Sequence, residues 1–265
     1  MTGDSRGAFD KLATRLLLPI AKELGWSAKP NESEESKLMR QAVLEALAVH
    51  TSDPWLYSEA SRRASAYLRD PGSVDPDTAT VALRAAARKG TVTLAALRKA
   101  LSDAVTPEQR LQLLRALGSF SDAKELHGAL DLTLDGTVKS GDVIYLVRSA
   151  SPWAESRAAL LDWLELHLAD LAVKIDGMSA SNMLGSPLAR TCDAAARARV
   201  EQAFSPLVTR IGGSQRRLSE TMEAADACID LRARQAQAAS AELARLSGDA
   251  RVLPTATKRV PRKPQ

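Results

Sequence analysis

Helix start signals recur along this chain, and they restrict its fold more than any other feature. Asp53, Asp75, Thr106 and Ser151 are each followed immediately by proline. A short polar side chain can accept a hydrogen bond from the free N–H groups at the start of a helix, and proline suits the first helical position. Each of these pairs therefore predicts the beginning of a helix.

The stretch from Thr106 to Asp122 shows this pattern most completely. Gln109, three residues after Thr106, completes a capping box, and leucines follow at helical spacing. Gly118 is expected to take the left-handed conformation that ends many helices, and Ser121 or Asp122 can cap the next helix. One helix is predicted to end here and another to begin at once.

Helix starts predicted in this way divide the chain into units of similar size. They lie near residues 33, 53, 75, 93, 106, 122, 140 and 151. Taken in pairs they give a unit of about 30 to 45 residues, the size of the helix pairs that stack in solenoid proteins. Because one helix pair cannot cover its own apolar face, stacking produces a continuous core and a curved surface. The sequence therefore predicts an all-α fold, a HEAT- or armadillo-like α-solenoid in which antiparallel helix pairs form a curved bowl.

One segment argues against an all-helical chain. Residues 143–147, Val-Ile-Tyr-Leu-Val, have strong strand propensity. No second segment of comparable strength is available to pair with them, and a lone strand would leave its backbone groups unsatisfied. We therefore predict a helix there.

The C-terminal third is expected to hold weaker structure and then one long helix. Residues 176–187 carry glycine and serine and favour a loop or a short helix. From Ser214 to about Leu246 apolar residues keep helical spacing, which predicts a helix of roughly 50 Å at 1.5 Å per residue. We expect one helical-repeat domain over residues 1–250 and a disordered basic tail over 251–265.

The charge of the chain is concentrated in that tail. Its formal net charge of +4 equals the four basic residues Lys258, Arg259, Arg262 and Lys263, so the rest of the chain is neutral on balance. Aromatic residues make up only 4% of the chain, which leaves few side chains on which bases could stack. A nucleic-acid partner is therefore not expected. The tail is interpreted as solvated, although RNA, membrane lipid or an acidic partner are alternatives.

Nothing in the sequence predicts a membrane partner. No apolar run approaches the roughly 20 residues that a membrane span needs, and the N-terminus lacks a signal-peptide pattern. Cys192 and Cys228 stand at apolar positions of helical patterns, and we interpret them as small buried thiols. These observations predict a soluble cytoplasmic protein.

The histidines form no recognisable metal motif. His50, His127 and His167 are the only ones, and none belongs to a His-Glu-x-x-His arrangement. His167 has Glu165 and Asp170 nearby, so a metal or acid–base role is an alternative to the simpler interpretation of a surface histidine beside a carboxylate. His50 is placed at a helix C-terminus, where a cation is favourable.

A second candidate site is also better explained by local structure. Gly212-Gly213-Ser214, followed by Arg216-Arg217, could cradle a phosphate, but the spacing matches no phosphate-binding fingerprint. A helix end followed by a serine cap explains it without a ligand. The sequence thus assigns no catalytic, cofactor-binding or metal-binding residue.

Several segments together resemble a known family. Residues 18–26, Leu-Pro-Ile-Ala-Lys-Glu-Leu-Gly-Trp, followed by Lys29-Pro30, resemble the opening of the C-terminal helical domain of zinc aminopeptidases such as aminopeptidase N and puromycin-sensitive aminopeptidase. Residues 110–122, 157–163 and 215–229 are similar to later parts of that domain, in the same order. The resemblance covers about residues 8–245.

The resemblance implies a specific role. In that family the domain is an all-helical, HEAT-like bowl without catalytic residues, which closes over a separate zinc domain, limits access and offers a surface to the distal part of the peptide. The zinc motif and the catalytic tyrosine belong to domains that are absent here, so zinc is expected only in that catalytic domain. Ala169 stands where the family often has asparagine. The resemblance identifies no peptide-binding residue in this chain.

Two functional hypotheses follow. The first is the non-catalytic C-terminal domain of a zinc-dependent aminopeptidase, which caps the active-site chamber, has the catalytic domains and peptide substrates as partners, and shows no peptidase activity alone. The second is a freestanding helical-repeat scaffold that binds a protein or peptide in its concave face. A severed domain should expose an apolar docking face, whereas a freestanding scaffold should not.

Overall fold

The computed structural model describes residues 3–175, 192–206, 208 and 214–248, and every regular element within these ranges is helical. The predictions made for residues 176–187, for Gly212 and Gly213, and for the tail at 251–265 lie outside them. The longer helices are α1 (Gly3–Leu24), α2 (Glu34–His50), α3 (Pro54–Arg69), α4 (Pro76–Lys89), α5 (Leu94–Asp103), α6 (Pro107–Leu117), α7 (Ala123–Asp131), α8 (Val143–Ala150), α9 (Ala154–Lys174), α11 (Ala194–Phe204) and α12 (Ser214–Gly248). Short 3₁₀ helices occur at Pro71–Ser73 and Ser140–Asp142.

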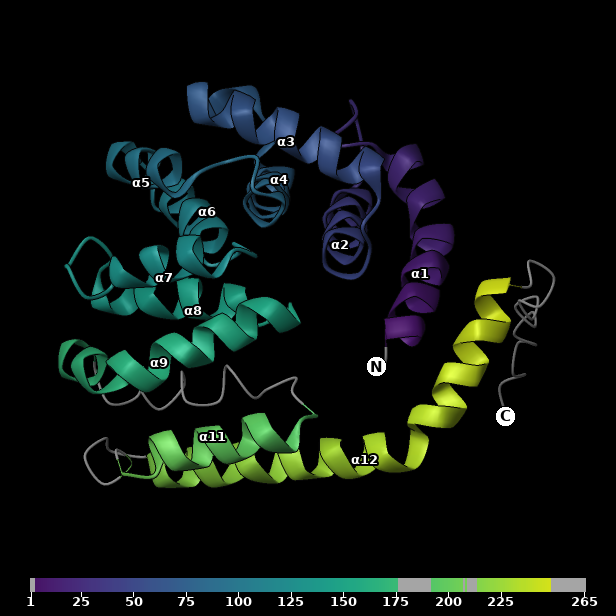
Figure 1. The fold of residues 1–265 in the computed structure, drawn as a ribbon. Helices are drawn as coiled ribbons and strands as arrows, with labels where there is room; N and C mark the ends of the chain where they lie inside the picture. The colour runs from purple at the N-terminus through teal and green to yellow at the C-terminus, as the bar shows by residue number, and fades with distance from the viewer. Residues whose placement is uncertain (1–2, 176–191, 207, 209–213, 249–265) are drawn as a thin grey trace, which may run out of the picture.

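Successive helices stack in two rows. In one row α2 contacts α4, α4 contacts α6, and α6 contacts α8; in the other, α3, α5, α7 and α9 follow one another. Figure 1 shows the chain of helices curving from α1 round to α9. The all-α prediction is confirmed, and residues 143–147 lie in α8 as predicted. The assignment to a HEAT- or armadillo-like solenoid stays a prediction. None of the helices in the described ranges has the length and apolar character needed to cross a membrane.

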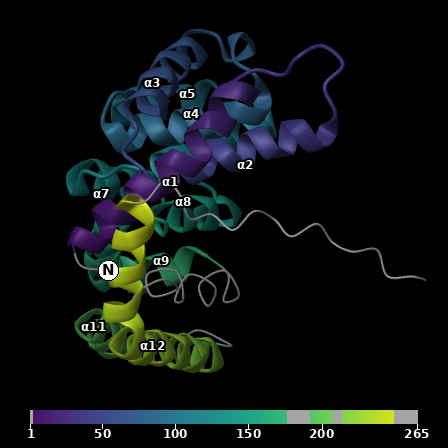
Figure 2. The same cartoon turned by 90° about the vertical axis from the view of Figure 1, so that its right-hand side faces the viewer.

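The last helix returns to the first. The first part of α12 runs beside α11, and Figure 1 shows that α12 then bends, so that its yellow end lies beside α1, as the turned view in Figure 2 also shows. The hydroxyl groups of Ser5 and Ser240 are 2.5 Å apart, and Arg15 donates to the carbonyl oxygens of Leu246 and Ser247. The predicted long helix is therefore present, but it is bent rather than straight, although it contains no proline.

Most predicted helix starts are confirmed. Asp53 and Asp75 cap α3 and α4 with proline in the first turn, and Thr106 forms the expected capping box with Gln109. The start predicted at Ser151 is wrong. That residue is the C-cap of α8, and α9 begins at Ala154 after an N-cap residue whose side chain makes no capping hydrogen bond.

Gly118 ends α6 but not in the predicted conformation. Its φ is −76°, whereas the left-handed conformation requires a positive φ. The residue must be small for another reason. A β-carbon at this position would lie 2.0 Å from the carbonyl oxygen of Leu146 in α8. Gly90, at the end of α4, does take the left-handed conformation, with φ 73°.

Buried apolar side chains form two clusters. The smaller lies among α1 to α4 and includes Trp26, Leu44 and Leu56. The larger extends from α3 to α12 and includes Phe120 and Trp163. Because α3 and α4 contribute to both clusters, these helices join the two halves of the core.

Candidate functional site

A groove crosses the row formed by α2, α4, α6 and α8. It has a volume of about 620 Å³. Each helix of the row contributes to it, and among the side chains that line it are Leu38 and Glu45 from α2, Arg84 from α4, Arg115 from α6, and Tyr145 and Arg148 from α8. The groove therefore depends on the stacking of helices from four separate parts of the sequence.

Arg84 is held in place by three neighbours. It forms an ion pair with Glu45, its Nε donates a hydrogen bond of 3.1 Å to the hydroxyl of Ser119, and its Cζ lies 5.3 Å from the centroid of the Trp153 ring. An arginine at this distance from an aromatic face is attracted to it. Glu45 balances the charge of Arg84, so this arginine adds no net charge to the wall of the groove.

Arg115 and Arg148 differ from Arg84 in their charge balance. In the part of the chain that the structure describes, neither guanidinium forms an ion pair. Arg115 is half-buried and Arg148 is exposed. The groove thus has an excess of positive charge, and it favours an anionic ligand such as a carboxylate or a phosphate.

The rim of the groove adds an aromatic and an apolar surface. Tyr145 is 39% exposed and Leu38 is 66% exposed, and both line the groove. Apolar contact surface next to charged donors is typical of sites that bind peptides or small molecules. The donors and the apolar surface that line the groove therefore suit the binding of a ligand.

The groove arginines were not singled out from the sequence, although a signal exists. Arg84, Arg115 and Arg148 lie 31 and 33 residues apart. These intervals match the predicted unit of two helices, so a basic residue that recurs at the same place of each unit will lie on one face of the stack. The regular spacing of these arginines is hard to recognise in the sequence, because the amino acids around them do not repeat.

Comparison with known proteins identifies the family. The model of the family described as the ERAP1-like C-terminal domain matches residues 1–227. The chain belongs to this family. The resemblance that residues 18–26 and the later segments indicated is thereby confirmed.

Relatives of this ERAP1-like domain are aminopeptidases. The chain is 28% identical to aminopeptidase M1-D of Oryza sativa subsp. japonica over 62% of its own length and 19% of the relative's. It is 25% identical to aminopeptidase M1-C of the same organism over 84% of its length and 26% of the relative's. It is 23% identical to the mitochondrial aminopeptidase 2 of Saccharomyces cerevisiae over 69% of its own length and 19% of the relative's. The chain thus spans between about a fifth and a quarter of the relatives it matches.

The histidines of the ERAP1-like domain serve in packing. The ring of His50 meets the ring of Phe9 edge-on at 5.4 Å, His127 Nε2 lies 2.8 Å from the carbonyl oxygen of Ala159, and His167 lies 4.9 Å from the Trp163 ring. Among the described residues, no group of three or more histidine, cysteine or acidic side chains could hold a metal ion.

The other side chains considered from the sequence are engaged in ion pairs. Glu165, the carboxylate near His167, accepts hydrogen bonds of 3.0 and 2.7 Å from Arg199. Arg199 also donates a hydrogen bond of 2.6 Å to Asp162, and these bonds together raise the pKa of its guanidinium above the ordinary value. Arg216 and Arg217, the basic part of the possible phosphate cradle, both pair with Glu220.

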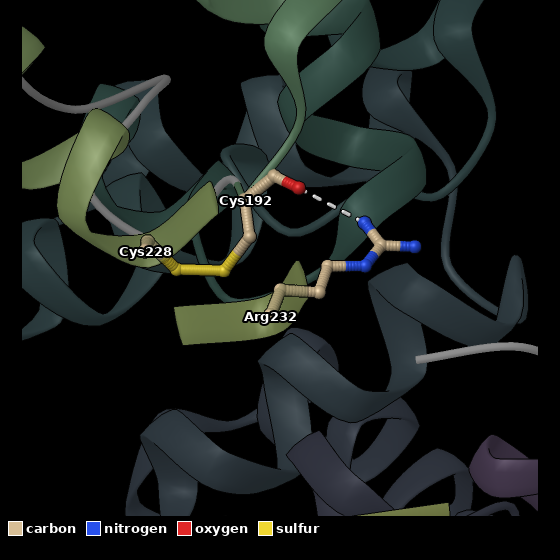
Figure 3. Close-up of a disulfide and its surroundings, with 3 residues drawn as sticks. All are labelled: Cys192, Cys228 and Arg232. Carbon is tan, nitrogen blue, oxygen red and sulfur yellow. Dashed lines mark hydrogen bonds between the residues drawn. A yellow bond between two sulfur atoms is a disulfide. The ribbon is translucent and has the colours of Figure 1, made fainter. Parts of the chain in front are cut away.

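The interpretation of the cysteines as free thiols is wrong. Cys192 and Cys228 form a disulfide, which Figure 3 shows next to Arg232. Cys192 lies outside any helix, just before Asp193, the N-cap of α11. The two residues are 36 positions apart, and only the return of α12 alongside α11 brings them together. Disulfides are typical of oxidising compartments, so the cysteines do not support a cytoplasmic location.

Proposed function

We propose that this chain is the non-catalytic C-terminal domain of a zinc-dependent aminopeptidase, where it caps the active-site chamber and controls the access and binding of peptides. Membership of the ERAP1-like C-terminal family supports the proposal. So does the length of the aminopeptidase relatives, because between 74% and 81% of each lies outside the part that matches this chain. In this proposal the catalytic domains, with their zinc, are supplied by the rest of a longer protein or by a partner chain.

The observation that carries the proposal is the positively charged groove. Arg115 and Arg148 offer guanidinium groups that no carboxylate of the described chain neutralises. A carboxylate at the far end of a peptide can accept paired hydrogen bonds from such groups. The apolar and aromatic side chains beside them, Leu38 and Tyr145, can contact the peptide's own side chains.

Such contacts would act on binding more than on the chemical step. The groove would hold the distal part of a peptide while its amino terminus occupies the catalytic domain. Interactions that are equal in the ground state and the transition state lower KM and leave kcat unchanged. Opening and closing of the bowl over the chamber would add control over which peptides enter.

The test uses the complete aminopeptidase that contains this domain, or the domain together with its catalytic partner. Arg115→Gln and Arg148→Gln remove the positive charge and keep most of the side-chain volume. We expect KM for a long peptide with a free carboxyl terminus to rise about tenfold, with kcat unchanged. The amidated form of the same peptide and a single-residue chromogenic substrate should be processed as before.

A matched control and two contrary outcomes complete the design. Arg216→Gln removes an exposed arginine on α12 that does not line the groove. It should leave KM and kcat for all three substrates unchanged. Equal losses on all substrates would assign the arginines to folding or to the chamber as a whole. An unchanged KM for the peptide with the free carboxyl terminus would show that the groove does not bind the peptide.

A further inference from the structure

The long helix α12 leaves the core part-way along its length. Leu218, Met222 and Ala225 are buried in its first part. After Ala225 no residue of the helix is buried, up to its end at Gly248. The second half of α12 is therefore held in place by something other than a hydrophobic core.

Three links join α12 to the start of α11 at the point where the burial stops. One is the disulfide between Cys192 and Cys228. Another is a hydrogen bond of 2.9 Å from Nη1 of Arg232 to the carbonyl oxygen of Cys192, drawn in Figure 3. The last is the ion pair between Arg197 and Asp226, with N–O distances of 2.7 and 3.1 Å. Of these links only the disulfide is covalent.

Beyond this point the hydrogen bonds that join α12 to α1 are part-buried or exposed to solvent. They are the hydrogen bond between Ser5 and Ser240 and those from Arg15 to the last carbonyl groups of the helix. Hydrogen bonds that water can replace contribute little net stability. The direction that α12 takes as it leaves α11 therefore decides whether these contacts with α1 can form.

A cavity of about 610 Å³ depends on the same arrangement. One wall consists of Ala236, Ala239 and Leu243 from the second half of α12, and Leu161 of α9 lies among the residues opposite. Cys192 and Arg232 also line it. If the second half of α12 moved away from α1, this cavity would lose one wall.

We propose that the Cys192–Cys228 disulfide is a redox-controlled brace that sets the position of the second half of α12. In the oxidised protein the bond fixes α12 against the start of α11, keeps the helix on α1 and preserves the cavity. Both cysteines are only half-buried, so a reductant can reach them. This device is independent of the groove and of the proposed aminopeptidase role.

The chemistry of the switch is thiol–disulfide exchange. A dithiol attacks one sulfur as its thiolate, the Sγ–Sγ bond breaks, and a mixed disulfide forms. The second thiol of the reductant then closes its own disulfide, so that two electrons and two protons end on Cys192 and Cys228 as two thiols. Of the three links, only the Arg232 hydrogen bond and the Arg197–Asp226 pair are left in the reduced chain to join α12 to the start of α11. Both are exposed to water, which can replace them when α12 opens locally.

The first measurement is the thiol content of the full chain. We expect alkylation without reductant to modify neither of the two cysteines, and alkylation after dithiothreitol to modify both. Two reactive thiols in the protein isolated without reductant would overturn the proposal at once.

The second measurement locates the effect of reduction. Trypsin should cleave after the exposed residues Arg232 and Arg234 about tenfold faster in the reduced protein, because local opening of α12 becomes easier. Cleavage after Arg62, in α3, should not change. Faster cleavage at all three sites would show that the disulfide stabilises the whole fold and not α12 in particular. Unchanged cleavage after Arg234 would show that the disulfide does not hold the second half of α12 in place.

Variants give an independent check. Cys192→Ser with Cys228→Ser should behave like the reduced protein in both oxidising and reducing buffers. Ala227→Ser changes the residue next to Cys228 and keeps the bond, so it should respond to dithiothreitol like the natural chain. Hydrogen exchange of α12 in the natural chain, with and without dithiothreitol, gives the same answer if the double variant does not fold.

Discussion

Gly118 and Leu146 bring the backbones of α6 and α8 into direct contact. A β-carbon on residue 118 would lie 2.0 Å from the carbonyl oxygen of Leu146 and 2.9 Å from the β-carbon of Ser149. An oxygen of the backbone cannot turn aside as the end of a flexible side chain can. The glycine is therefore what allows these two helices of the groove-forming row to pack as closely as they do.

Gly118→Ala should consequently destabilise the domain. We expect a loss of about 3 kcal/mol, because α8 must shift away from α6 to admit the methyl group. Urea unfolding followed by circular dichroism measures this. Gly7→Ala is the matched control, because a β-carbon there meets no atom within 4 Å and alanine favours the helix by about 1 kcal/mol. Equal stability of Gly118→Ala and the natural chain would contradict the packing described.

The hydrogen-bonded pair of Tyr67 and Gln112 should contribute to the loss of stability at alkaline pH. The hydroxyl of Tyr67 donates a hydrogen bond of 2.7 Å to Gln112 Oε1, and burial, helped by the charge of Glu108, raises the pKa of Tyr67 to about 12. The unfolded chain loses this proton near pH 10, at the ordinary tyrosine value. Between these two values the native state binds more protons, so stability falls as the pH rises.

Tyr67→Phe tests this prediction. The variant should lose about 1 kcal/mol at pH 7, because Gln112 Oε1 loses its donor, and its stability should fall less steeply between pH 10 and 12. The measurement is the free energy of unfolding at a series of pH values. Burial also raises the pKa of Tyr57, so some alkaline dependence should remain in the variant. An unchanged slope would mean that Tyr67 does not titrate as described.

The buried ion pair of Arg40 and Glu32 should act at the opposite end of the pH scale. Arg40 is fully buried, donates to Glu32 and to the carbonyl oxygen of Leu24 at the end of α1, and lowers the pKa of the Glu32 carboxyl. A carboxyl with a lowered pKa stabilises the native state above its ordinary value, and this stabilisation is lost as the pH falls through the native pKa.

Glu32→Gln should therefore melt several degrees below the natural chain at pH 7, where Arg40 is left without its counter-charge. The difference should shrink as the pH falls below about 4, because the natural chain then loses the charge as well. Melting curves of the variant and the natural chain at pH 7 and at a pH below about 4 measure this difference. Glu223→Gln removes an exposed carboxylate of α12 and should change neither curve by more than a degree or so. A difference that persists undiminished at low pH would refute the linkage.

Metal removal should leave the chain unaffected. Among the described residues no set of side chains could hold a metal ion. If the chain has the proposed non-catalytic role, incubation with a chelator should leave the melting temperature where it was, and added zinc should not produce release of amino-terminal residues from peptides. Zinc-dependent aminopeptidase activity of the chain alone would contradict the non-catalytic role.

The sequence predicted the features that are determined locally. The helix starts at Asp53, Asp75 and Thr106 depend on a side chain and the N–H groups two or three residues ahead, and they were predicted correctly. Ser151-Pro152 has the same local pattern, but Ser151 closes α8 instead. A capping residue next to proline cannot by itself distinguish the end of one helix from the start of the next.

Features that depend on distant contacts were missed. The conformation of Gly118 was misjudged because its reason lies in Leu146, which belongs to another helix. The pairing of Cys192 with Cys228 and the bend of α12 follow from the position of α11 and α1, which periodicity along the chain does not encode. The groove was predicted only as a curved surface, and its charge became visible when Arg115 and Arg148 came to lie on the same row of helices.

The contact between Ser5 and Ser240 joins residues 235 positions apart. Closing a loop of this length loses more chain entropy than closing the short loops between neighbouring helices, and it returns few buried contacts. Contacts between neighbours along the chain therefore form earlier in folding. During synthesis the face of α1 that contacts α12 stays without a partner until nearly the whole domain has been made. We expect the contact between α1 and α12 to form last in folding and to break first in unfolding.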